Sequence, residues 1–141
     1  MTTALLAVPT PTHPDVDVIE FPHSGPLPSG PHTAALIVRL PARLVVENRE
    51  GLKRLIEYQL GDGRRRFVFD MSECVYIDSS GLGMLVSVTK KAQRLGGRLV
   101  LTELHEDLVT LLALTHLDEV FNVSLRVIDA LAWFGVSEAT S

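Results

Sequence analysis

Short apolar runs alternate with segments of helical repeat along most of this chain, and this alternation restricts its fold more than any other feature. Residues 34–40 are nearly all apolar, as expected for a strand that is buried on both faces. The segments between such runs carry apolar residues three and four positions apart, which is typical of helices packed on a sheet. This order predicts an α/β layer fold with parallel central strands. We predict central strands over 34–40, 67–71 and 98–102, with helices around 52–60, 81–95 and 106–115.

Two further strands and a last helix complete the predicted fold. Residues 16–21 have the pattern of a strand, and Pro22, which ends it, favours an edge position antiparallel to the strand over 34–40. Residues 120–123 form a last short strand, and Ser124 is a good N-cap for a helix that continues to Gly135. The prediction is therefore a mixed β-sheet of four to five strands packed with about four α-helices.

Prolines gather at the amino end of the chain and limit where the core can form. Seven of the eight prolines lie in the first 31 residues, so the packed core has to come from the remainder. We predict a disordered N-terminal tail over residues 1–14, one domain over 15–137 and a C-terminal tail over 138–141. A chain of 141 residues with 46% hydrophobic residues fits one globular domain and is too short for a two-domain enzyme.

The charge balance and the apolar runs exclude two classes of protein. Lysine and arginine number 13 against 17 aspartates and glutamates, so the chain lacks the excess of positive charge that binding to nucleic acid requires. No run approaches the roughly 18 apolar residues of a membrane span, and the amino end has no basic segment typical of a signal peptide. We therefore predict a cytoplasmic protein that has no direct nucleic-acid partner.

The remaining reactive or charged residues favour structural roles. Cys74 is the sole cysteine and stands in an apolar setting, which excludes an internal disulfide and predicts a core thiol. The five histidines have no metal-ligand spacing, and no loop typical of a cofactor site is present, so we predict neither metal nor cofactor. Three consecutive arginines, 64–66, are interpreted as a solvated loop in preference to a patch that binds an anionic ligand.

One segment carries the features of a functional site. Residues 77–83, Ile-Asp-Ser-Ser-Gly-Leu-Gly, form a predicted turn from a strand into a helix. Asp78 or Ser79 is the expected N-cap, and the two glycines at 81 and 83 would ease packing of the helix on the sheet. The first turn of a helix offers free N–H donors and a partial positive charge, and such a place tolerates an added phosphate. A serine hydrolase is disfavoured, because the G-x-S-x-G pattern is absent and the candidate bases His105 and His116 flank a helix without an oxyanion loop.

This segment and its flanks resemble a STAS domain of the anti-sigma factor antagonist class. The resemblance rests on residues 78–83, on the strand 66–71 before them, and on the segments 96–101 and 111–121 after them, and it extends over residues 16–136. It implies that Ser79, with Ser80 as its neighbour, is phosphorylated by a partner anti-sigma factor that is itself a serine kinase. It also implies that the protein is not an enzyme, that a phosphoserine phosphatase reverses the modification, and that sigma-factor-dependent transcription is regulated. The partner-binding residues that it implies are Asp78, Ser79, Ser80, Gly81, Leu82, Gly83 and Met84.

One position departs from the pattern of that family. Members carry a G-x-L-D-like motif whose aspartate lies near the phosphoacceptor, and the matching stretch here is 42–45, with Val45 in place of the aspartate. Val45 cannot accept a hydrogen bond through its side chain. This departure supports a second hypothesis, in which the same fold serves as a non-phosphorylated adaptor in a signalling complex or in lipid transport machinery.

The helix predicted over 81–95 has a second apolar stripe. Met84, Val88 and Leu95 lie opposite the stripe that includes Leu82 and Leu85. One stripe should contact the sheet. The other should contact a neighbouring helix, the interpretation that we prefer, or a partner protein for which an exposed methionine would suit adaptable contacts.

Overall fold

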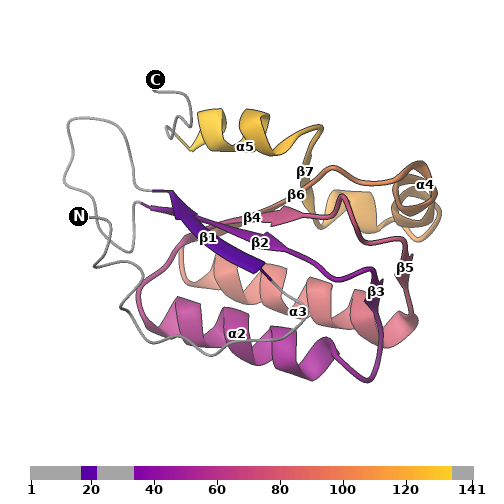
Figure 1. Cartoon of the computed structure of the whole chain (residues 1–141), viewed down its shortest axis with the longest axis horizontal. Helices are drawn as coiled ribbons and strands as arrows, with labels where there is room; N and C mark the ends of the chain where they lie inside the picture. Colours follow the sequence, from indigo (N-terminus) through magenta and orange to yellow (C-terminus); the bar gives the residue numbers. More distant parts are fainter. Residues whose placement is uncertain (1–16, 22–33, 135–141) are drawn as a thin grey trace.

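The computed structural model describes residues 17–21 and 34–134, which form a five-stranded sheet with α-helices on both faces (Figure 1). The strand order is β1-β2-β4-β6-β7, with β1 antiparallel to β2 and the other neighbouring pairs parallel. The predicted mixed sheet with parallel central strands is thereby confirmed, as is the edge position of β1. The strands are β1 (Asp17–Phe21), β2 (Ala35–Arg39), β4 (Arg66–Asp70), β6 (Arg98–Thr102) and β7 (Asn122–Ser124).

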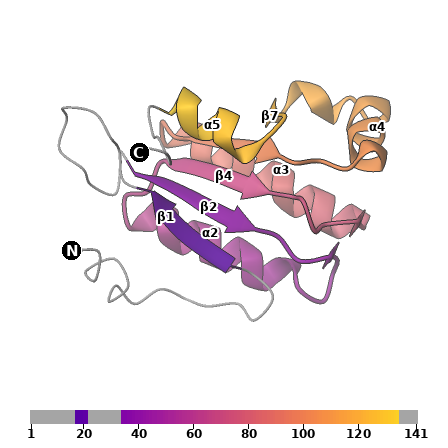
Figure 2. The ribbon, with the colours of Figure 1, turned by 45° about the horizontal axis from the view of Figure 1, so that its top comes forward.

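Helices cover the two faces of the sheet unequally. In Figures 1 and 2, α2 and α3 lie on one face and the shorter α5 lies on the other, while α4 stands near the carboxyl ends of the central strands. Side chains alternate between the faces along each strand, so a strand covered on both sides is apolar throughout. This explains the continuous apolar runs in the sequence. The helices are α2 (Arg49–Gly61), α3 (Ser79–Arg94), α4 (Glu106–Leu114) and α5 (Val127–Trp133).

The two faces carry two separate cores. The larger core lies under α2 and α3 and receives alternate residues of the central strands, such as Phe67 and Phe69 of β4. The smaller core lies under α5, where Val68 of β4 and Val100 of β6 contact Ala130 and Leu131. The predicted helical positions Leu52, Leu55, Ile56 and Leu60 and the predicted core thiol Cys74 are all buried in the larger core.

A two-stranded ribbon, absent from the sequence-based prediction, leads into α3. β3 (Arg43–Leu44) pairs in parallel with β5 (Tyr76–Ile77), outside the main sheet. Leu44 is fully buried, whereas Arg43 and Tyr76, which are register partners, are exposed. The ribbon therefore anchors one side in the core and presents the other to solvent.

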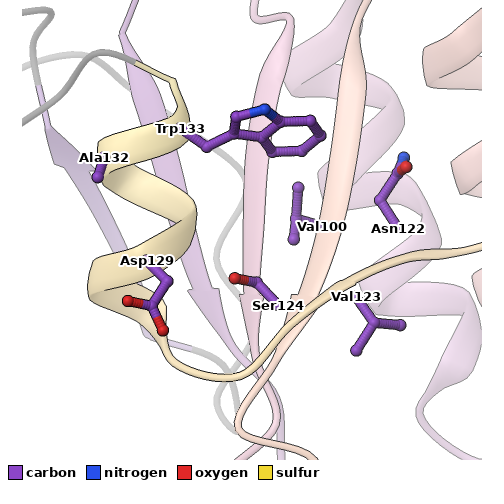
Figure 3. Close-up of a pocket in the computed structure, with 7 residues that line it drawn as sticks. All are labelled: Val100, Asn122, Val123, Ser124, Asp129, Ala132 and Trp133. Atoms are coloured by element: carbon purple, nitrogen blue, oxygen red, sulfur yellow. The ribbon is translucent and has the colours of Figure 1, made fainter.

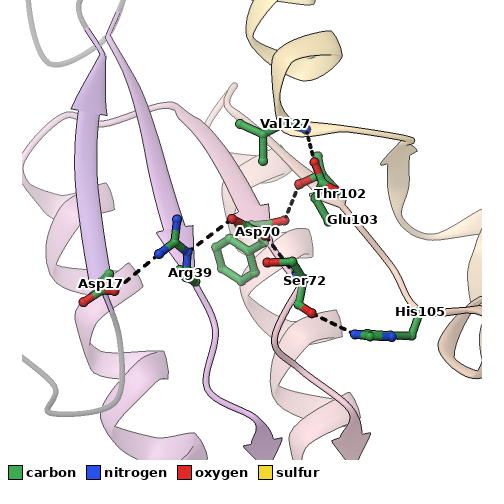
Figure 4. A network of polar contacts seen from close by, with 9 residues as sticks. Asp17, Arg39, Asp70, Ser72, Thr102, Glu103, His105 and Val127 are labelled. Carbon is green, nitrogen blue, oxygen red and sulfur yellow. Dashed lines mark hydrogen bonds and ion pairs between the residues drawn. The ribbon is translucent and has the colours of Figure 1, made fainter.

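A polar network ties the ends of the central strands to the loops that follow them (Figure 4). Asp70, the buried last residue of β4, accepts hydrogen bonds from Nε of Arg39 at 3.3 Å and from the backbone N–H of Ser72 at 2.9 Å. Nη1 of Arg39 lies 3.7 Å from Oδ2 of Asp17, and the carbonyl oxygen of Ser72 lies 2.8 Å from Nε2 of His105. These contacts hold β1 against β2 and the loop after β4 against the start of α4.

The structure corrects the predicted start of the last helix. Ser124 is the last residue of β7 and pairs with Thr102, and α5 begins only at Val127. The N–H of Val127 donates instead to Oε2 of Glu103 at 2.9 Å (Figure 4). Glu103 has a φ of 58°, a left-handed conformation that a non-glycine residue adopts only when its surroundings hold it. The last strand also differs from the predicted range 120–123, because β7 spans Asn122–Ser124 and a short 3₁₀ helix, η1 (Leu117–Glu119), lies before it.

The three consecutive arginines do not form a solvated loop. Arg64 is only 6% exposed. Nη1 of Arg65 donates to the carbonyl oxygen of Leu60 at 2.9 Å, and Nη1 of Arg66, already in β4, donates to the carbonyl oxygen of Phe134 at 2.8 Å. Arg65 and Arg66 therefore bind carbonyl groups near the ends of helices α2 and α5, where cations are favoured by the helix dipole.

Several predictions lie beyond these residues. The tails predicted over 1–14 and 138–141 fall outside the described residues. Within 17–21 and 34–134, no helix is long and apolar enough to cross a membrane.

Candidate functional site

The candidate site lies where the β3–β5 ribbon passes into α3. Asp78 follows β5 with an extended backbone, at φ −88° and ψ 176°, and α3 begins at Ser79. Oδ1 of Asp78 accepts hydrogen bonds from the N–H of Gly81 at 2.8 Å and from the hydroxyl of Ser80 at 2.7 Å. Asp78 is thus the N-cap of the helix, the first of the two residues predicted for that role.

The carboxylate of Asp78 is also held from the ribbon. Its Oδ2 accepts a hydrogen bond from the backbone N–H of Val46 at 3.0 Å, just beyond β3. The hydrogen bonds from Gly81 and then from Ser80 are the main causes that lower the pKa of Asp78 below its ordinary value of 3.8. Asp78 is therefore an ionised, fixed acceptor at neutral pH.

The two adjacent serines have different environments. Ser79 is exposed at the first position of α3, whereas Ser80 is partly buried and donates its hydroxyl to Asp78. Within the part of the chain that the structure describes, the hydroxyl of Ser79 has no hydrogen-bond partner. Ser79 is therefore the serine whose oxygen is open to an incoming reagent.

The two glycines of the segment have different roles, contrary to the prediction that both ease packing. A Cβ added at Gly81 would lie 2.4 Å from the carbonyl oxygen of Leu44, so the helix approaches the ribbon more closely than any side chain permits. A Cβ at Gly83 would meet no atom within 4 Å. Gly83 is exposed, and nothing in the structure explains it by packing.

The structure also corrects the prediction that Met84 binds a partner. Met84 is 3% exposed and belongs to the larger core, as does Val88. Of the two alternatives, packing inside the protein is thus the one that the structure supports. Leu82 is only partly buried, and Leu95, predicted to continue the stripe of Met84, is exposed beyond the end of the helix.

Val45, which stands where the family has an aspartate, lies at the end of β3 beside the site. Its backbone N–H donates to Oδ1 of Asn48 at 2.9 Å, and the next residue, Val46, binds Asp78. Nδ2 of Asn48 in turn donates to the carbonyl oxygen of Arg43 at 2.7 Å. The loop therefore keeps a defined shape through its backbone, although the side chain at position 45 is apolar.

Exposed apolar side chains that the sequence did not reveal flank Asp78. Val46 is 55% exposed, Val75 60% and Tyr76 46%. The guanidinium carbon of Arg43 lies 4.6 Å from the centre of the Tyr76 ring and so stacks on it. The exposure of residues 75 and 76 could not be predicted from the sequence, because a ribbon two residues long, with one face open, leaves too little pattern to detect.

Metal or hydrolytic chemistry finds little support around this site. Among residues 17–21 and 34–134, no group of three or more histidine, cysteine, aspartate or glutamate side chains could hold a metal ion. His105, a candidate base for a serine hydrolase, is paired through Nε2 with the carbonyl oxygen of Ser72. No hydrogen bond between the described residues joins His105 or His116 to Ser79 or Ser80.

The known proteins to which this chain is similar indicate one domain family. Residues 29–130 match the STAS domain. BtrV of Bordetella bronchiseptica, named as an anti-sigma factor antagonist, is 35% identical over 77 residues, which make up 55% of this chain and 59% of BtrV, so the match spans less than two thirds of that relative. The crystal structure of TM1081 from Thermotoga maritima, also named as such an antagonist, is 27% identical with a TM-score of 0.64 and covers 70% of this chain and 86% of its own. SpoIIAA of Bacillus in its phosphorylated form is 15% identical with a TM-score of 0.57, covers 70% and 89% of the two chains, and shows likeness of fold alone. The match over most of its length shows that this chain belongs to the STAS domain family.

Proposed function

We propose that this protein is an anti-sigma factor antagonist that binds an anti-sigma factor through the surface around Ser79 and is switched off when that partner, a serine kinase, phosphorylates Ser79. The names of BtrV and TM1081 support the antagonist role. The single observation that carries the proposal is the exposed hydroxyl of Ser79, which no described residue binds, beside the fixed carboxylate of Asp78. Release of the sigma factor by this binding would regulate transcription.

The ribbon supplies a docking surface next to that hydroxyl. Val46, Val75 and Tyr76 expose apolar side chains on the segments directly before α3 and directly after β3. Burying such side chains in an interface contributes about 25 cal/mol for each Å² of apolar surface removed from water. A partner that covers them also removes water from the neighbouring Ser79.

For phosphoryl transfer, this protein has to supply only the acceptor hydroxyl. Oγ of Ser79 attacks the γ-phosphorus of ATP, its proton passes to a base of the kinase, and ADP leaves. ATP, metal ion and base all belong to the kinase. Asp78 is engaged by three donors, Gly81, Ser80 and Val46, so it positions the helix start and is not the base.

The phosphate then opposes binding. It adds a charge of about −1.5 to −2 beside the ionised Asp78, in a surface that has to be desolvated. An uncompensated charge left in an interface costs on the order of 2 to 5 kcal/mol, which is roughly a 30-fold to several-thousand-fold loss of affinity. The fold itself tolerates the phosphate, because the first turn of a helix favours an anion. A phosphatase would restore binding.

Intact-mass measurement tests the modification. The protein is incubated with a candidate anti-sigma factor kinase and ATP, and one added phosphate is expected. Ser79→Ala should remain unmodified, whereas the matched variant Ser80→Ala should still gain one phosphate. Phosphate on Ser79→Ala, or its loss only in Ser80→Ala, would refute the assignment.

Binding measurements separate the switch from the adaptor hypothesis, which Val45 favours. Calorimetric titration with the anti-sigma factor should give near-normal affinity for Ser79→Ala and a loss of at least about 30-fold for Ser79→Asp. An adaptor without phosphorylation predicts normal binding by both variants. Thermal unfolding serves as the control, because Ser79→Asp should keep its fold.

A further inference from the structure

Two arginines lie side by side at the end of the sheet opposite Ser79. Arg66 and Arg98 are the first residues of β4 and β6, and they are register partners. Val68 and Val100, two positions further along the same strands, belong to the core under α5. Because side chains alternate along a strand, both arginines project to the α5 face, away from α3.

The end of α5 lies over these two arginines. The rings of Trp133 and Phe134 stack with their centres 5.9 Å apart, the guanidinium carbon of Arg98 lies 4.4 Å from the centre of the Trp133 ring, and that of Arg66 lies 5.8 Å from the centre of the Phe134 ring. These four side chains line a small pocket of about 200 Å³. The pocket is therefore walled by cations and aromatic faces.

Like charges on neighbouring strands repel each other, so an anion between them is favoured. Arg66 is engaged within the protein, among others by the carbonyl oxygen of Phe134 at 2.8 Å, so Arg98 is the main anion-binding group of the pair. Arg98 is exposed, and within the described residues the ring of Trp133 is the one partner of its side chain. The ring leaves the N–H groups of Arg98 available, and a planar guanidinium can bind a carboxylate or phosphate through two parallel hydrogen bonds.

A larger pocket of about 560 Å³ continues from the other side of Trp133 (Figure 3). It runs between β6, β7 and α5, and Val100, Val123 and Ala132 make its lining largely apolar. Asp129 stands in Figure 3 at the end away from Trp133, where its Oδ2 lies 3.6 Å from Nε of Arg126. The cationic end of this region is thus separated from the Asp129–Arg126 ion pair by an apolar middle.

We propose that this region binds a small amphipathic organic anion, with its carboxylate or phosphate head at Arg98 and Arg66 and its apolar body beside Trp133 and Val100. The charge pattern sets the orientation, because the opposite one would bring the head group to Asp129, whose neighbouring cation, Arg126, is already paired with that carboxylate. The site lies on the α5 face, whereas Ser79 begins a helix on the other face. The inference is therefore independent of the proposed phosphorylation.

Trp133 is the sole tryptophan of the chain, so its indole N–H gives one peak in a ¹H–¹⁵N NMR spectrum and reports directly on this site. The full chain is titrated with phenylacetate, phenyl phosphate, inorganic phosphate and benzyl alcohol. Phenylacetate and phenyl phosphate each combine an anionic head with an apolar body. Comparing the two distinguishes a carboxylate ligand from a phosphate ligand. Each should bind at least roughly tenfold more tightly than inorganic phosphate and benzyl alcohol, because each of these supplies only one part.

Variants test the two halves separately. Arg98→Gln should weaken binding of phenylacetate or phenyl phosphate roughly 10- to 100-fold, whereas the matched variant Arg126→Gln should leave it unchanged. Ala132→Leu, which fills the apolar pocket at an exposed helical position, should weaken the organic anions but not inorganic phosphate. Equal binding by Arg98→Gln and wild type would overturn the proposal, as would equal binding of benzyl alcohol and phenylacetate, or no saturable shift with any probe.

Discussion

Replacing Gly81 by alanine tests the contact that places Ser79. Gly81 lies in the first turn of α3, and an added Cβ would come within 2.4 Å of the carbonyl oxygen of Leu44. That oxygen already accepts the N–H of Asp78 at 3.1 Å, so it is not free to move aside. Gly83→Ala is the matched control, because its Cβ would meet nothing within 4 Å on the same helix.

The expected magnitude follows from comparing the two variants. Alanine is favoured over glycine in a helix by about 0.8 to 1 kcal/mol, and this gain applies to both positions and cancels between them. What remains is the overlap at position 81, where Cβ would be about 1 Å too close to backbone; such overpacking typically costs about 1 to 3 kcal/mol. Gly83→Ala should thus be more stable than wild type by about 1 kcal/mol, and Gly81→Ala less stable than Gly83→Ala by about 1 to 3 kcal/mol.

Urea unfolding followed by circular dichroism measures this difference. In the NMR spectrum of Gly81→Ala, the amide of Val46 should also shift, because the helix start moves away from the ribbon and loosens the hydrogen bond between Val46 and Asp78. Equal stability of the two variants, with an unmoved Val46 amide, would show that the close approach does not constrain this corner of the fold.

Three further predictions concern other groups. The pKa of Asp78 is depressed in the folded protein by the hydrogen bonds from Gly81 and Ser80, so its stabilising effect is present above its ordinary value of 3.8 and is lost as the pH falls through the folded pKa. Asp78→Asn should therefore lose less stability than wild type as the pH is lowered through this range, as measured by urea unfolding at each pH. Glu103→Ala removes the acceptor for the N–H of Val127 and should lower the free energy of unfolding by about 0.5 to 2 kcal/mol, again by urea unfolding. Burial raises the pKa of the Cys74 thiol, so Cys74 should react with a thiol reagent only when the protein unfolds, as measured by absorbance with and without urea.

The main sheet could be predicted from the sequence because burial on both faces leaves a strong signal. The strands at 35–39, 66–70 and 98–102 are apolar nearly throughout, and glycines mark the ends of the helices between them. The antiparallel edge strand was also recognisable, because Pro22 cannot continue a paired strand. In each of these places the local sequence and the final packing agree.

The errors arose where a partner distant in sequence decides the local structure. Ser124 has the chemistry of an N-cap, but pairing with β6 takes it into a strand, and Glu103 supplies the cap instead. Arg65 and Arg66 look like surface charges, but carbonyl groups at the ends of α2 and α5 bind them. Such contacts leave no periodic trace in the sequence, because each joins residues from separate elements.

The N-cap at Asp78 was predictable, since a carboxylate at a strand-to-helix turn has a clear local reason to be there. The difference between Gly81 and Gly83 was not predictable, because it depends on where β3 passes. The exposure of Val46 and Tyr76 could not be predicted either, because the ribbon that exposes these residues is too short to show a pattern in the sequence.

Val45 changes the electrostatics of the site more than its geometry. The contact that joins the loop after β3 to Asp78 comes from the backbone N–H of Val46, so it needs no particular side chain at position 45. An aspartate there would add a second carboxylate near the proposed phosphoacceptor and would repel a phosphate group. With a valine at this position, Asp78 is the carboxylate that contacts the loop after β3. The unmodified surface is then more apolar and costs less free energy to desolvate. The charge of a phosphate on Ser79 would therefore make a larger difference to binding. On this reasoning, the valine that suggested an adaptor is equally compatible with the proposed switch, because it favours tight binding before phosphorylation and would preserve the loss of binding after it.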